Sequence, residues 1–211
     1  MISNIHDVQS SADYSRNMLA VNNKSREGRE HQTMTDEPHS PYKRTAFDGN
    51  VIRVNIERVT LPNAVTCDLE IIHHPGGAAA VALDDRERVC LVHQFRHAAD
   101  GWLWELPAGK IDDGEPHAET AERELREEAG VTAAQWDYLG AMVSSPGVFT
   151  ERVHLYLARQ LELGTPEQES EEVLEVHWLP LDEALVMAAD GRIIDAKSVI
   201  GLWRAARALE Q

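Results

Sequence analysis

The sequence predicts an α/β domain in which a mixed sheet lies between helices, preceded by an antiparallel β-hairpin. Three observations lead to this prediction. Apolar and polar residues alternate over the neighbouring segments 50–61 and 65–74, and a Pro-Asn-Ala turn separates them. Further strand-like segments precede and follow one acidic helix, and two helices close the chain. This order lacks the regular strand–helix alternation of a doubly wound parallel fold.

The first residues of the chain differ from the rest. Residues 1–44 are polar, rich in Ser, Asn and charge, and show no sustained period. Such a segment cannot bury enough apolar surface to offset its ordering entropy, so we expect disorder. Translation starting at Met34 is one interpretation, and a regulatory arm is the alternative. We expect residues 45–75 to form an N-terminal β-sheet segment and residues 76–211 to form the main domain.

The elements of the main domain follow from local patterns. Two apolar strands are expected around an Asp-Asp-Arg-Glu turn, and the stretch "WLWELPAGKIDDGE" is expected to be a loop because Pro and Gly punctuate it. Pro116 suits the first turn of a helix that ends near Gly130. The remaining expected elements are strands at 136–144, 152–161 and 173–181, an acidic loop at 164–172, and helices at 182–189 and about 195–209.

Composition restricts the partners. The 211 residues carry a formal net charge of −16, which argues against nucleic acids and anionic membranes because like charges repel. A small anionic substrate would need an intermediary cation. No apolar run approaches the length of a membrane span, and the N-terminus lacks the apolar core of a signal peptide. We therefore expect a cytoplasmic protein.

The helix "ERELREEAGV" concentrates negative charge. Glu124, Glu127 and Glu128 have the spacing i, i+3 and i+4, so their side chains are neighbours on one face. Each like-charge pair costs the helix roughly a few tenths of a kcal/mol. A solvated charged face is one explanation. A site for Mg²⁺ or Mn²⁺ is the other, since these cations prefer carboxylate oxygens. Composition and helical geometry alone leave both open.

The surrounding residues favour the metal site. From Gly109 there are five residues to Glu115, seven more to Arg123, and then "ELREEAGV". This spacing resembles the full signature of the Nudix hydrolase family. The resemblance implies an α/β/α sandwich with a loop–helix–loop and Mg²⁺-dependent hydrolysis of a nucleoside diphosphate linked to another moiety, with Mn²⁺ as a possible substitute.

The resemblance also assigns roles by position. Glu124, Glu127 and Glu128 correspond to metal ligands, and the carbonyl of Ala108 corresponds to a further one. Glu115 and Arg123 belong to the same catalytic motif, in which we expect them to hold the loop to the helix by an ion pair rather than to contact substrate.

Three flanking stretches resemble the ADP-ribose and sugar-nucleotide pyrophosphatase branch of the family. They are "WELPAGKID", "SSPGVFTERVHLYLA" and "GRIIDAKSVIGLW". The leading hypothesis is hydrolysis of ADP-ribose to AMP and ribose 5-phosphate. The alternatives are a GDP-mannose or other nucleoside diphosphate sugar hydrolase and, with less support because the signature glutamates are intact, a catalytically inactive binding module. This branch uses its N-terminal sheet to form a homodimer, so a homodimer is implied.

Substrate-binding candidates lie outside the signature. Arg96 could clamp a phosphate or stack on a base, although a plain surface arginine is the alternative. Glu105 and Glu151 could accept hydrogen bonds from ribose hydroxyls. Trp104 could stack on a base, but an aromatic residue at this spacing more often belongs to a core or an interface. Further candidates, whose backbone could approach the sugar or phosphate, are Ser145, Pro146 and Gly147. The histidines interpreted as structural are His73, His74 and His177.

The general base is expected on the acidic loop that follows the signature. Glu172 falls where the family has an acidic residue near the metals. Ser170 occupies the position where some members keep the base, which is a departure. Glu169 and Glu171 are the substitutes if the loop is shifted by one residue.

Overall fold

A computed structural model describes residues 42–168, 170 and 172–210. The first 41 residues lie outside this range, and with them most of the segment expected to be disordered. The end of that segment is corrected, because Lys43 and Arg44 already belong to a strand. Within the described part of the chain, no helix has the length and apolar character that crossing a membrane requires.

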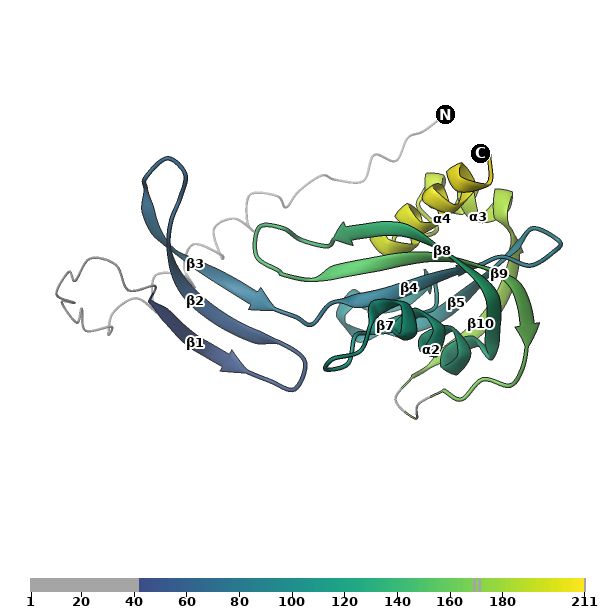
Figure 1. The fold of residues 1–211 in the computed structure, drawn as a ribbon, viewed down its shortest axis with the longest axis horizontal. Helices are drawn as coiled ribbons and strands as arrows, with labels where there is room; N and C mark the ends of the chain where they lie inside the picture. The colour runs from purple at the N-terminus through teal and green to yellow at the C-terminus, as the bar shows by residue number, and fades with distance from the viewer. Residues whose placement is uncertain (1–41, 169, 171, 211) are drawn as a thin grey trace, which may run out of the picture. The chain divides into compact units, whose positions relative to one another are not determined.

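The N-terminal segment forms an antiparallel sheet with the order β1–β2–β3 (Figure 1). Its strands are β1 (Lys43–Asp48), β2 (Arg53–Thr60) and β3 (Thr66–His73). The predicted hairpin corresponds to β2 and β3. These strands pair antiparallel without interruption, from Arg53 opposite His73 to Thr60 opposite Thr66. The sequence did not reveal β1, because all six of its residues are exposed and leave no apolar alternation to read.

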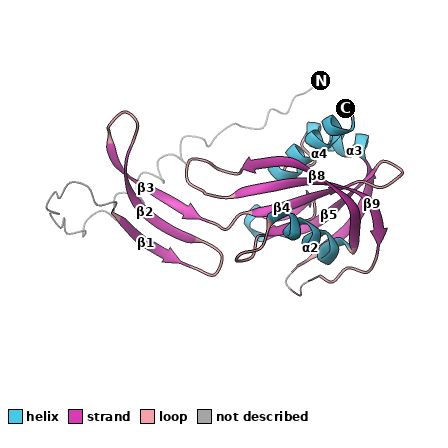
Figure 2. Ribbon diagram, viewed as in Figure 1, coloured by secondary structure: helices cyan, strands magenta, loops and turns pink. Residues whose placement is uncertain are grey.

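The main domain contains two sheets (Figure 2). One is mixed, with the order β7–β4–β9–β8, and the other is antiparallel, with the order β10–β5–β6. Strands β4 and β9 pair in parallel, and their other neighbours are antiparallel. The strands are β4 (Gly77–Ala82), β5 (Arg88–Arg96), β6 (Gly101–Glu105), β7 (Ala108–Lys110), β8 (Val131–Val143), β9 (Arg152–Leu163) and β10 (Leu174–Pro180).

The expectation of a loop at "WLWELPAGKIDDGE" was wrong in part. Residues of this stretch form β6, which pairs with β5, and the short strand β7, which pairs with β4. Pro107 does not prevent this, because it lies between the two strands and its carbonyl accepts a hydrogen bond from the Ala80 amide at 3.0 Å. The glycines and the proline therefore mark the connection between two strands rather than one long loop.

Helices cover both sides of the sheets, as the predicted sandwich requires. Helix α2 (His117–Ala129) lies on one side, and α3 (Leu181–Asp190) and α4 (Ala196–Leu209) lie on the other (Figure 1). Strand β4 shows why both sides are covered. Its alternating side chains pack on opposite faces, with Val81 in the cluster that contains Leu202 of α4 and Ala80 in the cluster that contains Leu125 of α2.

The helix ends follow local chemistry. Gly130 ends α2 in the left-handed region, with φ of 66°, and a Cβ there would lie 2.6 Å from the Pro166 nitrogen. Asp195 caps α4, since its carboxylate accepts the Ser198 amide hydrogen at 3.0 Å. These ends fix the direction in which α2 presents its acidic face and the position of the first turn of α4.

Candidate metal centre and active site

Helix α2 buries part of its acidic face. The apolar residues Ala121 and Leu125 are fully buried against the sheets, and Glu124 and Glu128 are only 8% and 2% exposed. A solvated charged face would leave such side chains in water. The geometry therefore argues against the solvated-face explanation for these two glutamates.

Three carboxylates meet at one end of the helix face. One oxygen each from Glu124, Glu128 and Glu172 can be chosen so that all lie within 4.8 Å of one another. Burial raises the pKa of the Glu128 carboxyl to about 8. Burial also raises the pKa of Glu124, and the nearby charge of Glu172 adds to this effect. Clustered carboxylates that resist ionisation mark a position where a cation would be strongly stabilising.

The donor set fits a hard divalent cation. It consists of carboxylate oxygens at the spacing that one ion can span, and no sulfur or imidazole belongs to the group. The backbone positions two of the three carboxylates. The Ala108 amide donates to Glu128 at 2.9 Å. Gly109 leaves room for Glu124, because a Cβ at that position would lie 2.0 Å from the carboxylate oxygen.

Glu127 occupies a different position from the other two predicted glutamate ligands. It lines a cavity beside the three carboxylates, but it is not part of the carboxylate group. Its side chain accepts hydrogen bonds from Arg123 at 3.2 Å and from Arg126 at 2.8 Å. The structure thus brings Glu172, from the loop before β10, to Glu124 and Glu128, while two arginines hold Glu127.

The predicted ion pair between Glu115 and Arg123 is present. Arg123 donates to both oxygens of Glu115, at 2.9 and 3.0 Å, and to the carbonyl of Lys110 at 3.2 Å. The Arg123 hydrogen bonds hold the pKa of Glu115 at about 2. Arg123 also donates to Glu124 at 2.7 Å. It therefore joins the loop to the helix and orients one carboxylate of the cluster.

A cavity of about 380 Å³ opens beside the carboxylates. Besides the acidic residues of α2 and Glu172, its lining includes the predicted residues Arg96 and Ala108 and three residues to which the sequence analysis gave no part in the site, His74, Lys110 and Asp112. The structural interpretation of His74 is therefore incomplete. Its Nδ1 accepts the Gly76 amide hydrogen at 3.0 Å, and its position two residues before a Gly-Gly pair was the available signal.

Glu105 does not line this cavity. It is 2% exposed, and its carboxylate accepts two hydrogen bonds from Arg96, at 2.8 and 2.9 Å, and one from Lys197 at 2.5 Å. The structure thus gives Glu105 a buried ionic role, and the ribose contact expected from the sequence stays a prediction. Arg96 remains on the cavity wall.

The loop between β8 and β9 holds four further candidates. Ser145, Pro146 and Gly147 are exposed and are absent from the cavity lining. Glu151 accepts a hydrogen bond from Ser144 and lies 3.6 Å from Nδ1 of His74. The loop therefore adjoins the cavity through His74.

Trp104 packs as the more common interpretation predicted. It is partly buried against the core cluster of α3 and α4 and stacks on His93 with ring centroids 4.5 Å apart. His177 contacts it edge-on at 4.8 Å. Among the base candidates, Glu172 lies in the carboxylate group, whereas Glu169 and Glu171 lie outside the described residues.

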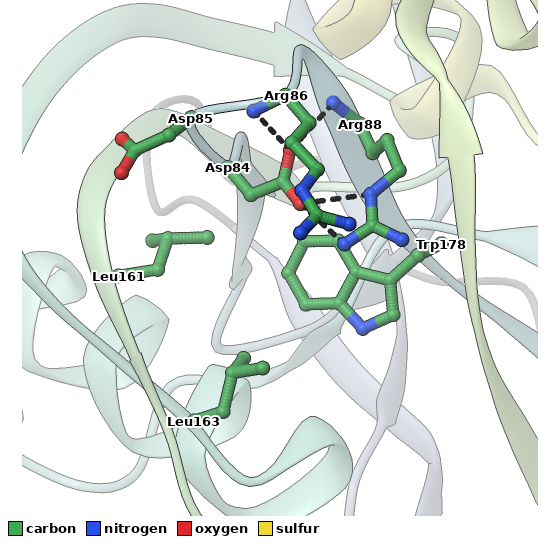
Figure 3. Close-up of a pocket in the computed structure, with 7 residues that line it drawn as sticks. All are labelled: Asp84, Asp85, Arg86, Arg88, Leu161, Leu163 and Trp178. Carbon is green, nitrogen blue, oxygen red and sulfur yellow. Dashed lines mark hydrogen bonds and ion pairs between the residues drawn. The ribbon is translucent and has the colours of Figure 1, made fainter.

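A second cavity, of about 290 Å³, shares no lining residue with the first. Figure 3 shows the carboxylate of Asp84 held between the backbone of its own turn and the Arg88 side chain. Arg88 also lies over the ring of Trp178, 5.9 Å from its centroid. These charges stabilise the turn before β5, and no carboxylate group suited to a metal was found here among the described residues.

Comparison with known proteins identifies the family. The NUDIX domain matches residues 73–200, and the chain belongs to this family. It is 36% identical over 162 residues to the ADP-ribose pyrophosphatase of Bacillus subtilis, covering 76% of this chain and 88% of that protein. It is 36% identical over 173 residues to the GDP-mannose pyrophosphatase of Klebsiella pneumoniae, covering 75% and 78%.

A solved structure supports the fold. The crystal structure of an ADP compounds hydrolase superposes with a TM-score of 0.69 at 20% identity, covering 83% of this chain and 97% of that chain. The predicted sandwich with a preceding antiparallel sheet is thereby confirmed.

Proposed function

We propose that this protein hydrolyses the pyrophosphate bond of a nucleoside diphosphate sugar, with ADP-ribose as the leading substrate and AMP and ribose 5-phosphate as products. The observation that carries the proposal is the group of Glu124, Glu128 and Glu172 beside a cavity that also contains Arg96. The ADP-ribose pyrophosphatase relative supports the choice of substrate. Mg²⁺ is the proposed cation, with Mn²⁺ as a substitute.

The chemistry follows from the residues around the cavity. Water attacks one phosphorus, the anhydride P–O bond breaks, and the bridging oxygen leaves with the other phosphate. Bound Mg²⁺ would neutralise the charge that develops on the phosphate oxygens. Glu124 and Glu128 would hold the cation, with Glu127 and the Ala108 carbonyl as further candidate ligands. Arg96 would bind a substrate phosphate.

Glu172 is the proposed base. It would accept the proton of the attacking water, because it reaches the carboxylate cluster from a separate loop. Glu169 and Glu171 remain candidates from the sequence. Pairing of Arg123 with Glu115 and Glu124 keeps one carboxylate of α2 in place during the reaction.

A GDP-mannose pyrophosphatase activity is the second candidate. The relative of that name matches the chain at the same identity as the ADP-ribose enzyme. The exposed loop of Ser145–Gly147 does not separate the two substrates, since both kinds of enzyme carry similar loops. We also propose that the N-terminal sheet forms a homodimer. Apolar side chains on it, including Phe47 and Leu69, are 54% and 36% exposed.

The deciding experiment is a turnover assay with Mg²⁺ on ADP-ribose, GDP-mannose, UDP-glucose, NADH, coenzyme A and dGTP. Preference for ADP-ribose with release of AMP supports the proposal, and preference for GDP-mannose keeps the mechanism but changes the substrate. Glu128→Gln should lower turnover by orders of magnitude in a folded protein. Absence of turnover on every compound would refute the proposal and favour an inactive binding module.

A further inference from the structure

We propose that Lys197, on the last helix, is a positioning residue that acts through Glu105 to fix the guanidinium of Arg96 at the cavity wall. Substrate affinity would then depend on the first turn of α4. The inference rests on the proposed function, because it concerns how an anionic substrate is bound at the same site.

Glu105 holds Arg96 from one side. In the register of β5 and β6, Arg96 faces Gly101 and Glu105 faces Val92, so both side chains lie on the same face of the strand pair. Glu105 accepts from Nε and Nη2 of Arg96 at 2.8 and 2.9 Å. This pairing uses two of the five guanidinium N–H groups, and the remaining three can donate to a phosphate.

Lys197 holds Glu105 in turn. Its Nζ donates to Oε2 of Glu105 at 2.5 Å and to Asp195, the cap of α4, at 3.1 Å. Ser198 completes the attachment, since its hydroxyl donates to Asp195 at 2.5 Å and accepts the Leu106 amide hydrogen at 2.7 Å. The start of α4 is thereby bonded to Glu105 and to the residue that follows it.

Burial makes the arrangement sensitive to the loss of Lys197. Glu105 is 2% exposed, and a buried carboxylate needs charged partners to stay ionised. Burial by itself would raise the pKa of Glu105, but hydrogen bonds and charge from Arg96 and Lys197 hold the pKa below its usual value. Without Lys197, Glu105 would either stay ionised and draw Arg96 closer, or take up a proton and lose its ion pair with Arg96. Both outcomes move the guanidinium of Arg96.

The other cations of the cavity cannot easily replace Arg96. Lys110 is paired with Asp112 at 2.6 Å, and Arg123 is paired with Glu115 and Glu124. Both pairs include a carboxylate that itself lines the cavity. Arg96 differs because its carboxylate partner lies behind the wall. It is therefore the side chain best placed to offer positive charge to a diphosphate.

The test measures KM and kcat for ADP-ribose at saturating Mg²⁺ in Lys197→Met and Lys197→Arg. We expect KM to rise about tenfold in Lys197→Met, with kcat within about threefold of wild type, because the metal ligands are untouched. Lys197→Arg should restore most of the affinity. Arg207→Met, which removes a cation from the other end of α4, should keep the wild-type KM.

A double-mutant cycle separates positioning from general packing. In a Glu105→Gln background the relay is already broken, so Lys197→Met should add little to KM. Any one of four results would overturn the proposal. They are an unchanged KM in folded Lys197→Met, a fall in kcat as large as the rise in KM, no recovery of affinity in Lys197→Arg, and additive effects of the two substitutions on KM in the cycle. If Lys197→Met does not fold, Lys197→Gln carries the same expectation.

Failure of the proposed function can be told apart from failure of this inference. If wild-type protein turned over none of the compounds, binding of inorganic pyrophosphate in the presence of Mn²⁺ would be measured by calorimetry. Affinity about tenfold weaker in Lys197→Met than in wild type would support the positioning role. Equal affinity would overturn it.

Discussion

Glu128 offers a sharp test of the carboxylate cluster through the stability of the metal-free protein. Its carboxyl is buried, and burial raises its pKa from 4.5 to about 8. Between these two values the folded protein keeps a proton that the unfolded chain has released. The contribution of Glu128 to the free energy of unfolding therefore falls as pH rises from about 5 to 8, which is opposite to the behaviour of a salt-bridged carboxylate.

The size of the effect follows from the shift. Each pKa unit corresponds to about 1.4 kcal/mol, so a shift from 4.5 to about 8 gives a loss of the order of 5 kcal/mol across the window. Glu124 acts in the same direction, because its pKa is also raised by burial. In Glu128→Gln the amide oxygen can still accept the Ala108 hydrogen bond without a charge. The variant should thus lose much less stability over the same range.

The assay is urea unfolding in EDTA at pH 5.5, 6.5 and 7.5 for wild type, Glu128→Gln and Glu122→Gln. The last variant removes an exposed glutamate of the same helix and should follow wild type. Added Mg²⁺ should restore wild-type stability most strongly at pH 7.5. A wild-type stability that is flat or rising with pH in EDTA, or the same slope in Glu128→Gln, would refute the reasoning.

Three further predictions follow from the site. Glu172→Gln should lower kcat by about 100-fold or more in a protein whose metal-free melting temperature is no lower than that of wild type, whereas Glu175→Gln on the adjacent strand should keep wild-type turnover. Gly109→Ala should weaken Mn²⁺ binding about tenfold or more in a calorimetric titration, because the new Cβ would meet the Glu124 carboxylate. Glu115→Gln should lower the free energy of unfolding by about 1 kcal/mol at pH 7. The pKa of Glu115 is lowered to about 2, so its ion pair contributes fully above about pH 4.5. Thermal unfolding should therefore show the difference from wild type shrinking as pH falls toward 2.

Local spacing determined the part of the site that could be predicted. The signature from Gly109 to Val131 occupies one loop and one helix, so the distance between any two of its residues depends mainly on helical geometry. The pairing of Glu115 with Arg123 was expected from the family resemblance that this spacing carries. The helix end at Gly130 was also readable, because a left-handed residue favours glycine.

Tertiary contacts determined the rest. Glu172 reaches Glu124 and Glu128 from a loop more than forty residues away, and the sequence could suggest but not fix this meeting. Two arginines hold Glu127 aside, although helical spacing alone makes it equivalent to its neighbours. Lys197 was present in a quoted motif without a role, because its partner Glu105 is ninety-two positions away.

The proposed cation site accounts for the concentration of carboxylates on one helix of an acidic protein. Arg123 and Arg126 offset the repulsion around Glu127, but Glu124 and Glu128 remain largely buried beside Glu172. Burying carboxylates together costs stability that the apolar side of the helix must supply. A cation bound only by the folded state returns free energy in proportion to the logarithm of its concentration, about 2.7 kcal/mol at one hundred times its Kd. If these three carboxylates hold the proposed cation, they both destabilise the metal-free fold and create its affinity for the cation. Any substitution that relieves the destabilisation should then weaken cation binding.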